Sequence, residues 1–203
     1  MPLERAARLA VFASGSGTNL QALLDAFPPN GADPLGRIVL AISDRRGARA
    51  LDRARSAGAA AEHVAYHRRP DGTLDRAGFE ARAHALLEAH RIDVVAFAGF
   101  LRIVSPGFVA TWSGRLLNVH PSLLPAFPGL HAVRQALDAG VPRTGCTVHF
   151  VDAGVDTGPA IVQRTVDVLP GDTEDALQAR VQREEHLAYP DAVRRVLRGE
   201  ARP

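Results

Sequence analysis

The chain alternates between short, continuous runs of apolar residues and longer stretches in which apolar residues recur at helical spacing. The main apolar runs are predicted as buried strands at 9–13, 37–43, 93–97 and 116–119. Helical spacing predicts helices at 19–27, 47–57, 74–90 and from 173 to about 198. Continuous apolar strands that alternate with helices indicate an α/β fold, with a Rossmann-like, mostly parallel sheet covered by helices on both faces.

The second half of the chain adds weaker elements to this pattern. A shorter strand is predicted at 62–66, a short helix from Ser105-Pro106, and an antiparallel strand pair at 147–151 and 160–168 near the C-terminus. Asp172 is predicted to cap the last helix. Pro190 is predicted to kink or restart that helix, because proline lacks the backbone N–H of a helix interior.

Composition narrows the class of protein. A length of 203 residues fits one domain with a sizeable core, and 24 basic against 22 acidic residues, a net charge of +2, disfavours a nucleic-acid binder. Cys146 is the only cysteine, which excludes an internal disulfide and a cysteine-rich metal site. The segment 1–13 has no secretion signal, and the apolar run 94–101 is too short to cross a bilayer. We therefore expect a cytoplasmic protein that binds neither nucleic acid nor membrane.

A glycine-rich turn, Ser14-Gly-Ser-Gly-Thr-Asn19, joins the first strand to the first helix. Free amides at a helix start can hold a phosphate. Leu20 stands where a dinucleotide fingerprint has Gly or Ala, and the absence of lysine excludes a Walker motif. The turn is therefore interpreted as a site for a terminal phosphate, with a tight turn that binds no ligand as the alternative.

Asn118 and His120 are two residues apart at the end of a predicted strand, so their side chains face the same side. A histidine exchanges protons near neutral pH, and an Asn NH2 group can stabilise a developing oxyanion. Two polar residues satisfied by loop backbone are the alternative. The proline-rich continuation at 121–129 favours a site, because a stiff loop keeps it open at low entropic cost. Asp156, in an Asp/Gly-rich loop, could stabilise the His120 imidazolium, or could simply form an Asx turn.

Nearly the whole chain resembles the glycinamide ribonucleotide formyltransferase family. The resemblance rests on the segments 14–19, 98–103, 145–149 and 152–159 and on the string Asn118-Val-His-Pro-Ser-Leu-Leu-Pro125. It implies the formyltransferase fold in a single domain, 1–203. Within that domain, 1–110 would form the phosphate and nucleotide side, and 111–203 the catalytic and folate side.

The resemblance also implies an activity: attack of the glycinamide ribonucleotide amine on the formyl carbon of 10-formyltetrahydrofolate, without a metal, in a monomer or homodimer. The implied catalytic residues are Asn118, His120 and Asp156. The implied ribonucleotide contacts are Gly17, Thr18, Asn19, Gln182 and Glu185. The implied folate contacts are Arg76, Leu101, Arg102, Ile103, Val104, Asn118, Asp152, Ala153, Gly154, Val155 and Asp156. His149 belongs to a matching segment, but an inward-facing strand histidine is more often structural.

Several other functions share parts of this pattern. A formyltetrahydrofolate hydrolase or another folate-dependent formyltransferase would use the same residues with a different acceptor. A nicotinamide-dependent oxidoreductase is disfavoured by Leu20, and a nucleotide-binding module without catalysis is disfavoured by the occurrence of Asn118, His120 and Asp156 together.

Overall fold

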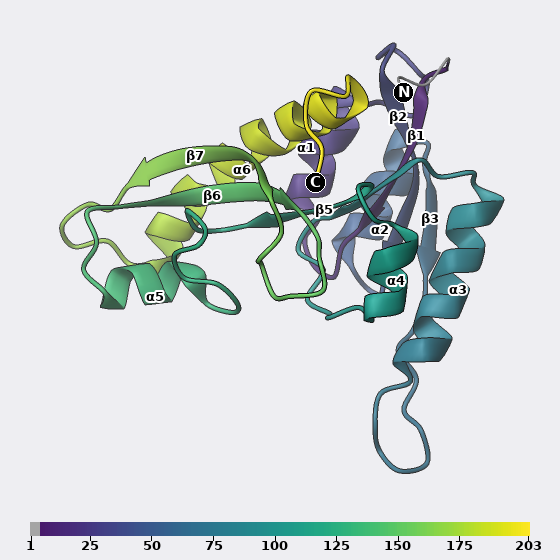
Figure 1. Ribbon diagram of the computed structural model, residues 1–203, viewed down its shortest axis with the longest axis horizontal. Coiled ribbons are helices and arrows are strands. Elements are labelled where there is room, and N and C mark those ends of the chain that lie inside the picture. The colour runs from purple at the N-terminus through teal and green to yellow at the C-terminus, as the bar shows by residue number, and fades with distance from the viewer. Residues whose placement is uncertain (1–4) are drawn as a thin grey trace.

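The computed structural model describes residues 5–203, which form one seven-stranded sheet flanked by helices (Figure 1). The strands are β1 Ala7–Phe12, β2 Gly36–Ser43, β3 Ala60–His63, β4 Val94–Phe97, β5 Leu116–His120, β6 Arg143–Phe150 and β7 Ala160–Asp167. The helices are α1 Thr18–Ala26, α2 Arg49–Ala57, α3 Arg76–Ala89, α4 Pro106–Thr111, α5 Ala132–Asp138 and α6 Glu174–Leu197.

The strand order, β3-β2-β1-β4-β5-β6-β7, determines where a ligand can bind. β1 to β5 run parallel, whereas β6 pairs antiparallel with both β5 and β7. The chain moves outward from β1 to β3 and then returns to β4 on the other side of β1. The carboxyl ends of β1 and β4 therefore flank a topological switch point, which is where ligands bind in open α/β sheets.

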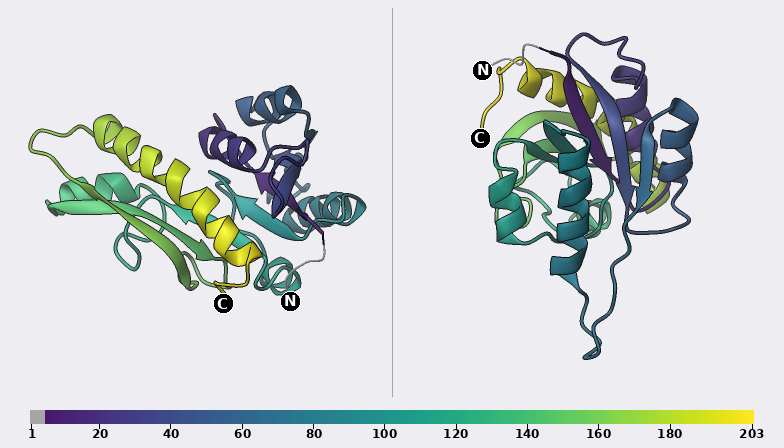
Figure 2. Two further views of the ribbon diagram at one scale, coloured as in Figure 1. Left: turned by 90° about the horizontal axis from the view of Figure 1, so that it is seen from above. Right: turned by 90° about the vertical axis from the view of Figure 1, so that its right-hand side faces the viewer.

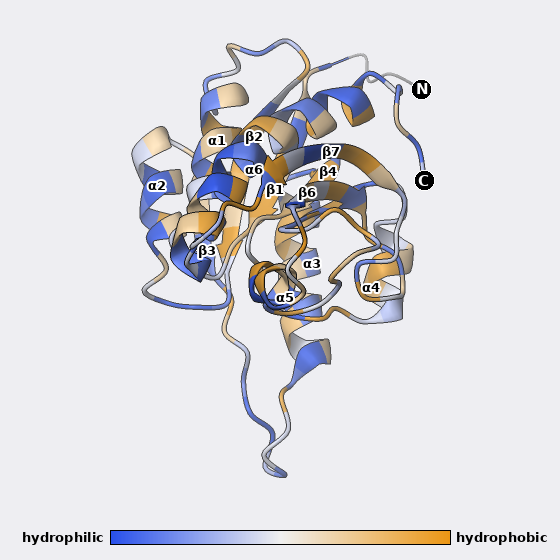
Figure 3. Cartoon of the chain, turned by 90° about the vertical axis from the view of Figure 1, so that its left-hand side faces the viewer, coloured by the Kyte–Doolittle hydropathy of each residue, from blue (hydrophilic) through white to orange (hydrophobic). Residues whose placement is uncertain are grey.

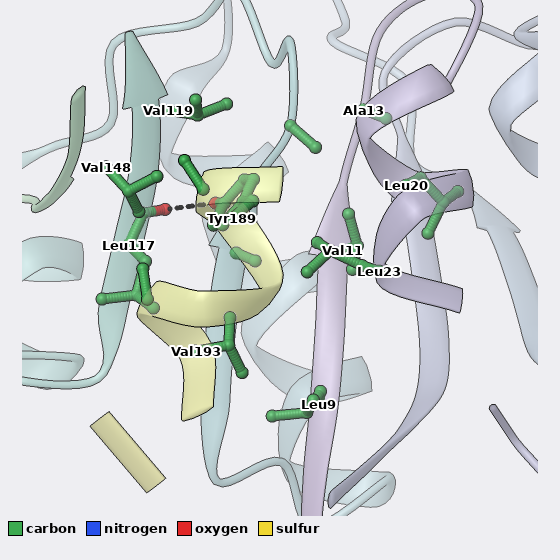
Figure 4. Close-up of a cluster of buried hydrophobic side chains, with 14 of the residues drawn as sticks. Leu9, Val11, Ala13, Leu20, Leu23, Leu117, Val119, Val148, Tyr189 and Val193 are labelled. Atoms are coloured by element: carbon green, nitrogen blue, oxygen red, sulfur yellow. Dashed lines mark hydrogen bonds between the residues drawn. The ribbon is translucent and has the colours of Figure 1, made fainter. Parts of the chain in front are cut away.

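The helices cover the two faces of the sheet separately (Figure 2). α1, α2, α5 and α6 pack on one face around a large apolar cluster, and α3 and α4 pack on the other. In Figure 3 the hydrophobic colour concentrates on the central strands. The buried Tyr189 hydroxyl of α6 lies 2.9 Å from the carbonyl oxygen of Phe97 and 3.2 Å from that of Leu117, so it shares its one O–H between β4 and β5. Figure 4 shows the contact with Leu117.

The predicted fold class is confirmed, including the antiparallel pair near the C-terminus. Several boundaries differ: β3 begins and ends earlier than predicted, β6 begins at Arg143, and α5 was not predicted. The cap of α6 is Thr173, whose side chain accepts from Ala176 N, so the prediction of Asp172 is wrong. Asp172 instead accepts from Leu169 N and pairs with Arg180.

Pro190 lies inside the continuous helix α6 and does not restart it. Tyr189 and Pro190 are both buried against the sheet, so tertiary packing holds the helix together through the position of the missing hydrogen bond. No helix among residues 5–203 has the length and apolar character needed to cross a membrane.

Candidate active site

A cavity of about 540 Å³ opens at the switch point of the sheet. Its walls come from the segments that follow β1, β4 and β5, from the loop between β6 and β7, and from α6. Most of the predicted site residues line it: Gly17, Thr18, Asn19, Leu101, Arg102, Ile103, Val104, Asn118, His120, Asp152, Ala153, Gly154, Val155, Asp156, Gln182 and Glu185. Gln178 lines it as well, although no sequence motif singled it out.

One end of the cavity is the glycine-rich turn after β1. Gly17 has a φ of 71°, and a Cβ there would lie 2.6 Å from the Ala50 Cα, so both the backbone conformation and the close approach of α2 require glycine. Arg53 donates to the Ser16 carbonyl at 2.9 Å and holds the turn from α2. No side chain of the described residues caps α1, which leaves the first-turn amides available to an anion.

Glu185 reaches the cavity from α6. Its side chain accepts a 2.8 Å hydrogen bond from Asn19 Nδ2, which connects the turn after β1 to the last helix. Burial raises the pKa of Glu185, and the Asn19 hydrogen bond lowers it by less. A buried carboxylate beside the uncapped amides of this turn suits a ligand that carries both an amine and a phosphate.

His120 ends β5, with both ring nitrogens facing oxygen acceptors. Nδ1 lies 3.2 Å from Asp156 Oδ2, and Nε2 lies 2.8 Å from the Phe127 carbonyl oxygen. Phe127 has a φ of 54°, in the left-handed region, and this conformation turns the proline-rich loop back toward His120. The carboxylate and the carbonyl both accept hydrogen bonds, so each ring nitrogen of His120 faces a group to which it can only donate.

Asp156 meets His120 from the loop after β6. Its φ is 55°, a conformation that Asp adopts more readily than most residues, and its Oδ2 also accepts from Gly129 N at 2.8 Å. Burial acts to raise the pKa of Asp156, but the hydrogen bonds to its carboxylate, the Gly129 N–H among them, and the facing His120 outweigh burial, so the pKa lies below its usual value. The carboxylate is therefore ionised at neutral pH.

His149 completes this polar cluster from β6, directly opposite Asn118 in the strand pairing. Its Nε2 lies 3.2 Å from Asn118 Nδ2, and its Nδ1 lies 2.8 Å from the Phe150 carbonyl oxygen. It contacts a predicted catalytic residue, which sequence reasoning did not foresee. The signal that could have revealed it is the antiparallel register of β5 and β6.

The loop after β4 forms the opposite wall of the cavity. The exposed side chains of Leu101 and Ile103 flank Arg102, which turns away to pair with the buried Asp44 carboxylate at 2.7 Å. Ser105, just after the loop, donates from both its N and Oγ to Glu80 of α3, each at 2.6 Å. Asp44 and Glu80 thus hold the loop from outside the cavity, and neither was predicted.

Arg76 is exposed at the first residue of α3 and lies outside the cavity walls. The structure therefore does not bring it together with the other predicted folate contacts. No group of three or more His, Cys, Asp or Glu side chains among residues 5–203 is arranged to hold a metal ion.

The sheet topology and the cavity at its switch point place the chain in the formyltransferase class of α/β folds. The model of the formyl transferase family matches residues 7–193, and the chain belongs to this family. The resemblance noted from the sequence motifs is thereby confirmed.

Individual relatives agree with this assignment. The chain is 44% identical over 183 residues to the phosphoribosylglycinamide formyltransferase of Escherichia coli (90% of this chain, 83% of the relative). A glycinamide ribonucleotide transformylase structure from Symbiobacterium toebii superimposes with a TM-score of 0.88 at 48% identity, covering 97% of this chain and 90% of that one. The trifunctional purine biosynthetic protein adenosine-3 of Drosophila melanogaster is 44% identical over 198 residues. The aligned region covers 98% of this chain but only 14% of the length of that protein.

Proposed function

We propose that this protein transfers the formyl group of 10-formyltetrahydrofolate to the amine of glycinamide ribonucleotide, a step of purine biosynthesis. The observation that carries the proposal is the contact of His120 with Asp156 at 3.2 Å, in a cavity that begins at an anion-binding turn. The names of the relatives support formyl transfer and the choice of acceptor.

The ribonucleotide would bind with its phosphate on the amides of Gly17, Thr18 and Asn19. Gln182 and Glu185 lie next along the cavity wall, and the Glu185 carboxylate would accept a hydrogen bond from the glycinamide amine. The folate would lie against the backbone of 101–104 and the loop 152–156. Arg76 would reach the folate only at the outer edge of the site, since it lies outside the cavity walls.

The chemical step is attack of the amine nitrogen on the formyl carbon, which gives a tetrahedral intermediate with a negative oxygen. Asn118 Nδ2 would donate one hydrogen bond to that oxygen. His120 Nε2 would donate a second by exchanging the Phe127 carbonyl for the oxyanion. As the C–N10 bond breaks, one proton must pass from the amine to N10. The Asp156–His120 pair supports that transfer: the protonated His120 ring would give a proton to N10, and the neutral ring would then take up the proton that the amine loses, so the pair ends as it began.

Sister activities differ only in the acceptor. Water in place of the amine would give a formyltetrahydrofolate hydrolase, and a different amine would give another formyltransferase. The Asn19–Glu185 contact beside the turn favours an acceptor that carries both an amine and a phosphate. A nicotinamide-dependent oxidoreductase or a non-catalytic nucleotide-binding module would leave the Asn118, His120 and Asp156 cluster without a role.

The test is an assay of purified protein with 10-formyltetrahydrofolate, with and without glycinamide ribonucleotide. We expect tetrahydrofolate and formylglycinamide ribonucleotide to form in equal amounts, and only when the acceptor is present. Tetrahydrofolate and formate appearing without the acceptor would identify a hydrolase. Binding of a nicotinamide dinucleotide instead of folate, measured by titration, would refute the proposal.

We also propose that the chain acts as one domain in the cytoplasm, as a monomer or homodimer. Residues before and after position 110 line the same cavity, which supports a single domain in which the phosphate side and the catalytic side meet. Size-exclusion chromatography with light scattering at several protein concentrations would determine the oligomeric state.

A further inference from the structure

The position of His149 indicates a role beyond packing. It is a buried residue of β6, with a side chain 3% exposed, and it lines the catalytic cavity beside Asn118. The two residues are direct cross-strand partners, so their side chains project to the same face of the sheet. The role of His149 depends on which atoms the two side chains turn toward each other.

The Nδ1 atom of His149 carries a proton. It lies 2.8 Å from the Phe150 carbonyl oxygen, and a carbonyl only accepts hydrogen bonds. The protonation of Nε2 then decides the charge of the ring: a proton there would make His149 a cation, and its absence leaves a neutral ring with an acceptor at Nε2.

The charges around the cluster favour the neutral ring. The titratable groups that face His149 are Asp156, on the loop after β6, and His120, on β5. His120 already faces Asp156 and the Phe127 carbonyl with its two ring nitrogens, so the single carboxylate already has a histidine partner. An imidazolium at His149 would be a buried cation without a carboxylate of its own, which is costly.

The distances agree with this distribution of charge. His149 Nε2 lies 3.6 Å from Asp156 Oδ1, longer than a hydrogen bond, and 3.2 Å from Asn118 Nδ2, within hydrogen-bond range. A neutral Nε2 has only a lone pair to offer. The Asn118 side chain must therefore turn its NH2 group toward the ring, because the opposite orientation would place the amide oxygen against that lone pair.

We propose that His149 is a positioning residue that acts through Asn118: as the neutral Nδ1–H tautomer it accepts a hydrogen bond from Asn118 and so fixes the orientation of the Asn118 amide. One N–H of Asn118 is held by the ring, and the second remains free at the wall of the cavity that both residues line. Formyl transfer needs a donor at that point rather than an acceptor, since the oxygen of the tetrahedral intermediate is negative.

The tautomer can be measured directly on the wild-type protein without substrate. Long-range ¹H–¹⁵N correlation spectra of histidine-labelled protein at pH 7 distinguish a protonated ring nitrogen from an unprotonated one. Loss of one set of signals in His149→Leu assigns the residue among the eight histidines. We expect a protonated Nδ1 and an unprotonated Nε2 at His149. A protonated Nε2 would overturn the proposal.

The positioning role is tested by a double-mutant cycle with His149→Leu and Asn118→Ala. We expect His149→Leu to lower kcat roughly ten- to hundredfold, less than the loss of an oxyanion donor itself, with the KM of both substrates changed less than about twofold. In the Asn118→Ala background the same substitution should change kcat less than about twofold, because nothing remains to be oriented. An equal loss of kcat in both backgrounds would overturn the proposal.

His84→Leu serves as the matched control for this cycle, because His84 is a partly exposed residue of α3 outside the cavity. We expect its kcat to remain within about twofold of wild type. The kinetic test rests on the proposed function, whereas the measurement of the tautomer does not. A wild-type protein without formyltransferase activity would refute the proposed function. The tautomer of His149 would then be decided by the NMR measurement alone.

Discussion

The side-chain nitrogen of Asn19 donates a 2.8 Å hydrogen bond to the carboxylate of Glu185, so the first turn of α1 is joined to the middle of α6 across 166 positions of sequence. Both residues are buried, and burial raises the pKa of Glu185. The fold alone therefore disfavours the ionised form of the Glu185 side chain. Such a group is expected where a ligand supplies the missing partner.

This relationship predicts that Glu185→Gln stabilises the ligand-free protein at neutral pH. The wild-type carboxyl has a higher pKa in the folded state than in the unfolded one. Its ionisation therefore has no effect on stability below about pH 4.5 and destabilises the fold increasingly as the pH rises toward the folded-state pKa. Glutamine can still accept from Asn19 and carries no charge.

The measurement is the Tm of both proteins from pH 4 to pH 8. We expect the two values to coincide at the acid end and the variant to be higher near pH 7, with roughly 2–4 °C for each kcal/mol in a domain of this size. The same variant should raise the KM for the ribonucleotide at least about tenfold, since it removes a charge-assisted hydrogen bond. A lower Tm for the variant at pH 7 would contradict this account.

The second prediction concerns the pair His120 and Asp156. His120→Ala should lower kcat roughly a hundred- to a thousandfold, because it removes an oxyanion donor, while both substrates continue to bind. Asp156→Asn should also lower kcat, since it removes the carboxylate that faces His120 Nδ1. Equilibrium binding of folate and steady-state kinetics separate the two effects. Near-normal turnover by His120→Ala would exclude the proposed role.

The third prediction concerns the loop after β4, which Glu80 holds through two hydrogen bonds to Ser105. Glu80→Ala frees this end of the loop, so we expect the KM for 10-formyltetrahydrofolate to rise about five- to tenfold, equivalent to losing one to two ordinary hydrogen bonds. The kcat and the KM for the ribonucleotide should change less than about twofold. Glu88→Ala, at an exposed position of the same helix, is the control. Equal effects of the two substitutions would show that Glu80 does not act through the loop.

Sequence patterns predicted the parts of this molecule that depend on local periodicity. The apolar runs located the central strands, and the two-residue spacing of Asn118 and His120 placed them on one face. The assignment of Asp156 needed the family resemblance as well, because an Asp/Gly-rich loop alone favours an Asx turn.

The residues that sequence reasoning missed act through tertiary contacts. Asp44 and Glu80 hold the loop after β4 from 58 and 25 positions away, a distance at which no periodicity operates. The α5 segment is short and buries Ala132, Val133 and Ala136, so its apolar pattern was too brief to distinguish from a loop. The Asn118–His149 contact required the strand register, which becomes visible only in the sheet.

The last prediction compares two buried threonines of β6. The Thr147 hydroxyl donates to the Ser122 carbonyl at 2.7 Å and accepts from Leu124 N (3.0 Å) and Gln163 Nε2 (2.9 Å), so it holds the start of the proline-rich loop that continues to the His120 partner Phe127. Thr144 is equally buried, but its hydroxyl has no hydrogen-bond partner among the described residues.

Thr→Val removes the hydroxyl at either site with little change in shape, so the two variants isolate the value of the hydrogen bonds. Thr147→Val removes the partner of the part-buried Leu124 N–H and of the buried Ser122 carbonyl, and should destabilise the fold by about 1–3 kcal/mol. It should also lower kcat, because the loop that carries the Phe127 carbonyl is less constrained. Thr144→Val should be neutral or stabilising, since it replaces an unpaired buried hydroxyl by a methyl group. Urea unfolding at constant m-value measures both changes. As a control, Thr147→Ser should retain most of the stability, because it keeps the hydroxyl. If Thr144→Val is as unstable as Thr147→Val, packing of the new methyl group, rather than the loss of hydrogen bonds, determines the loss of stability.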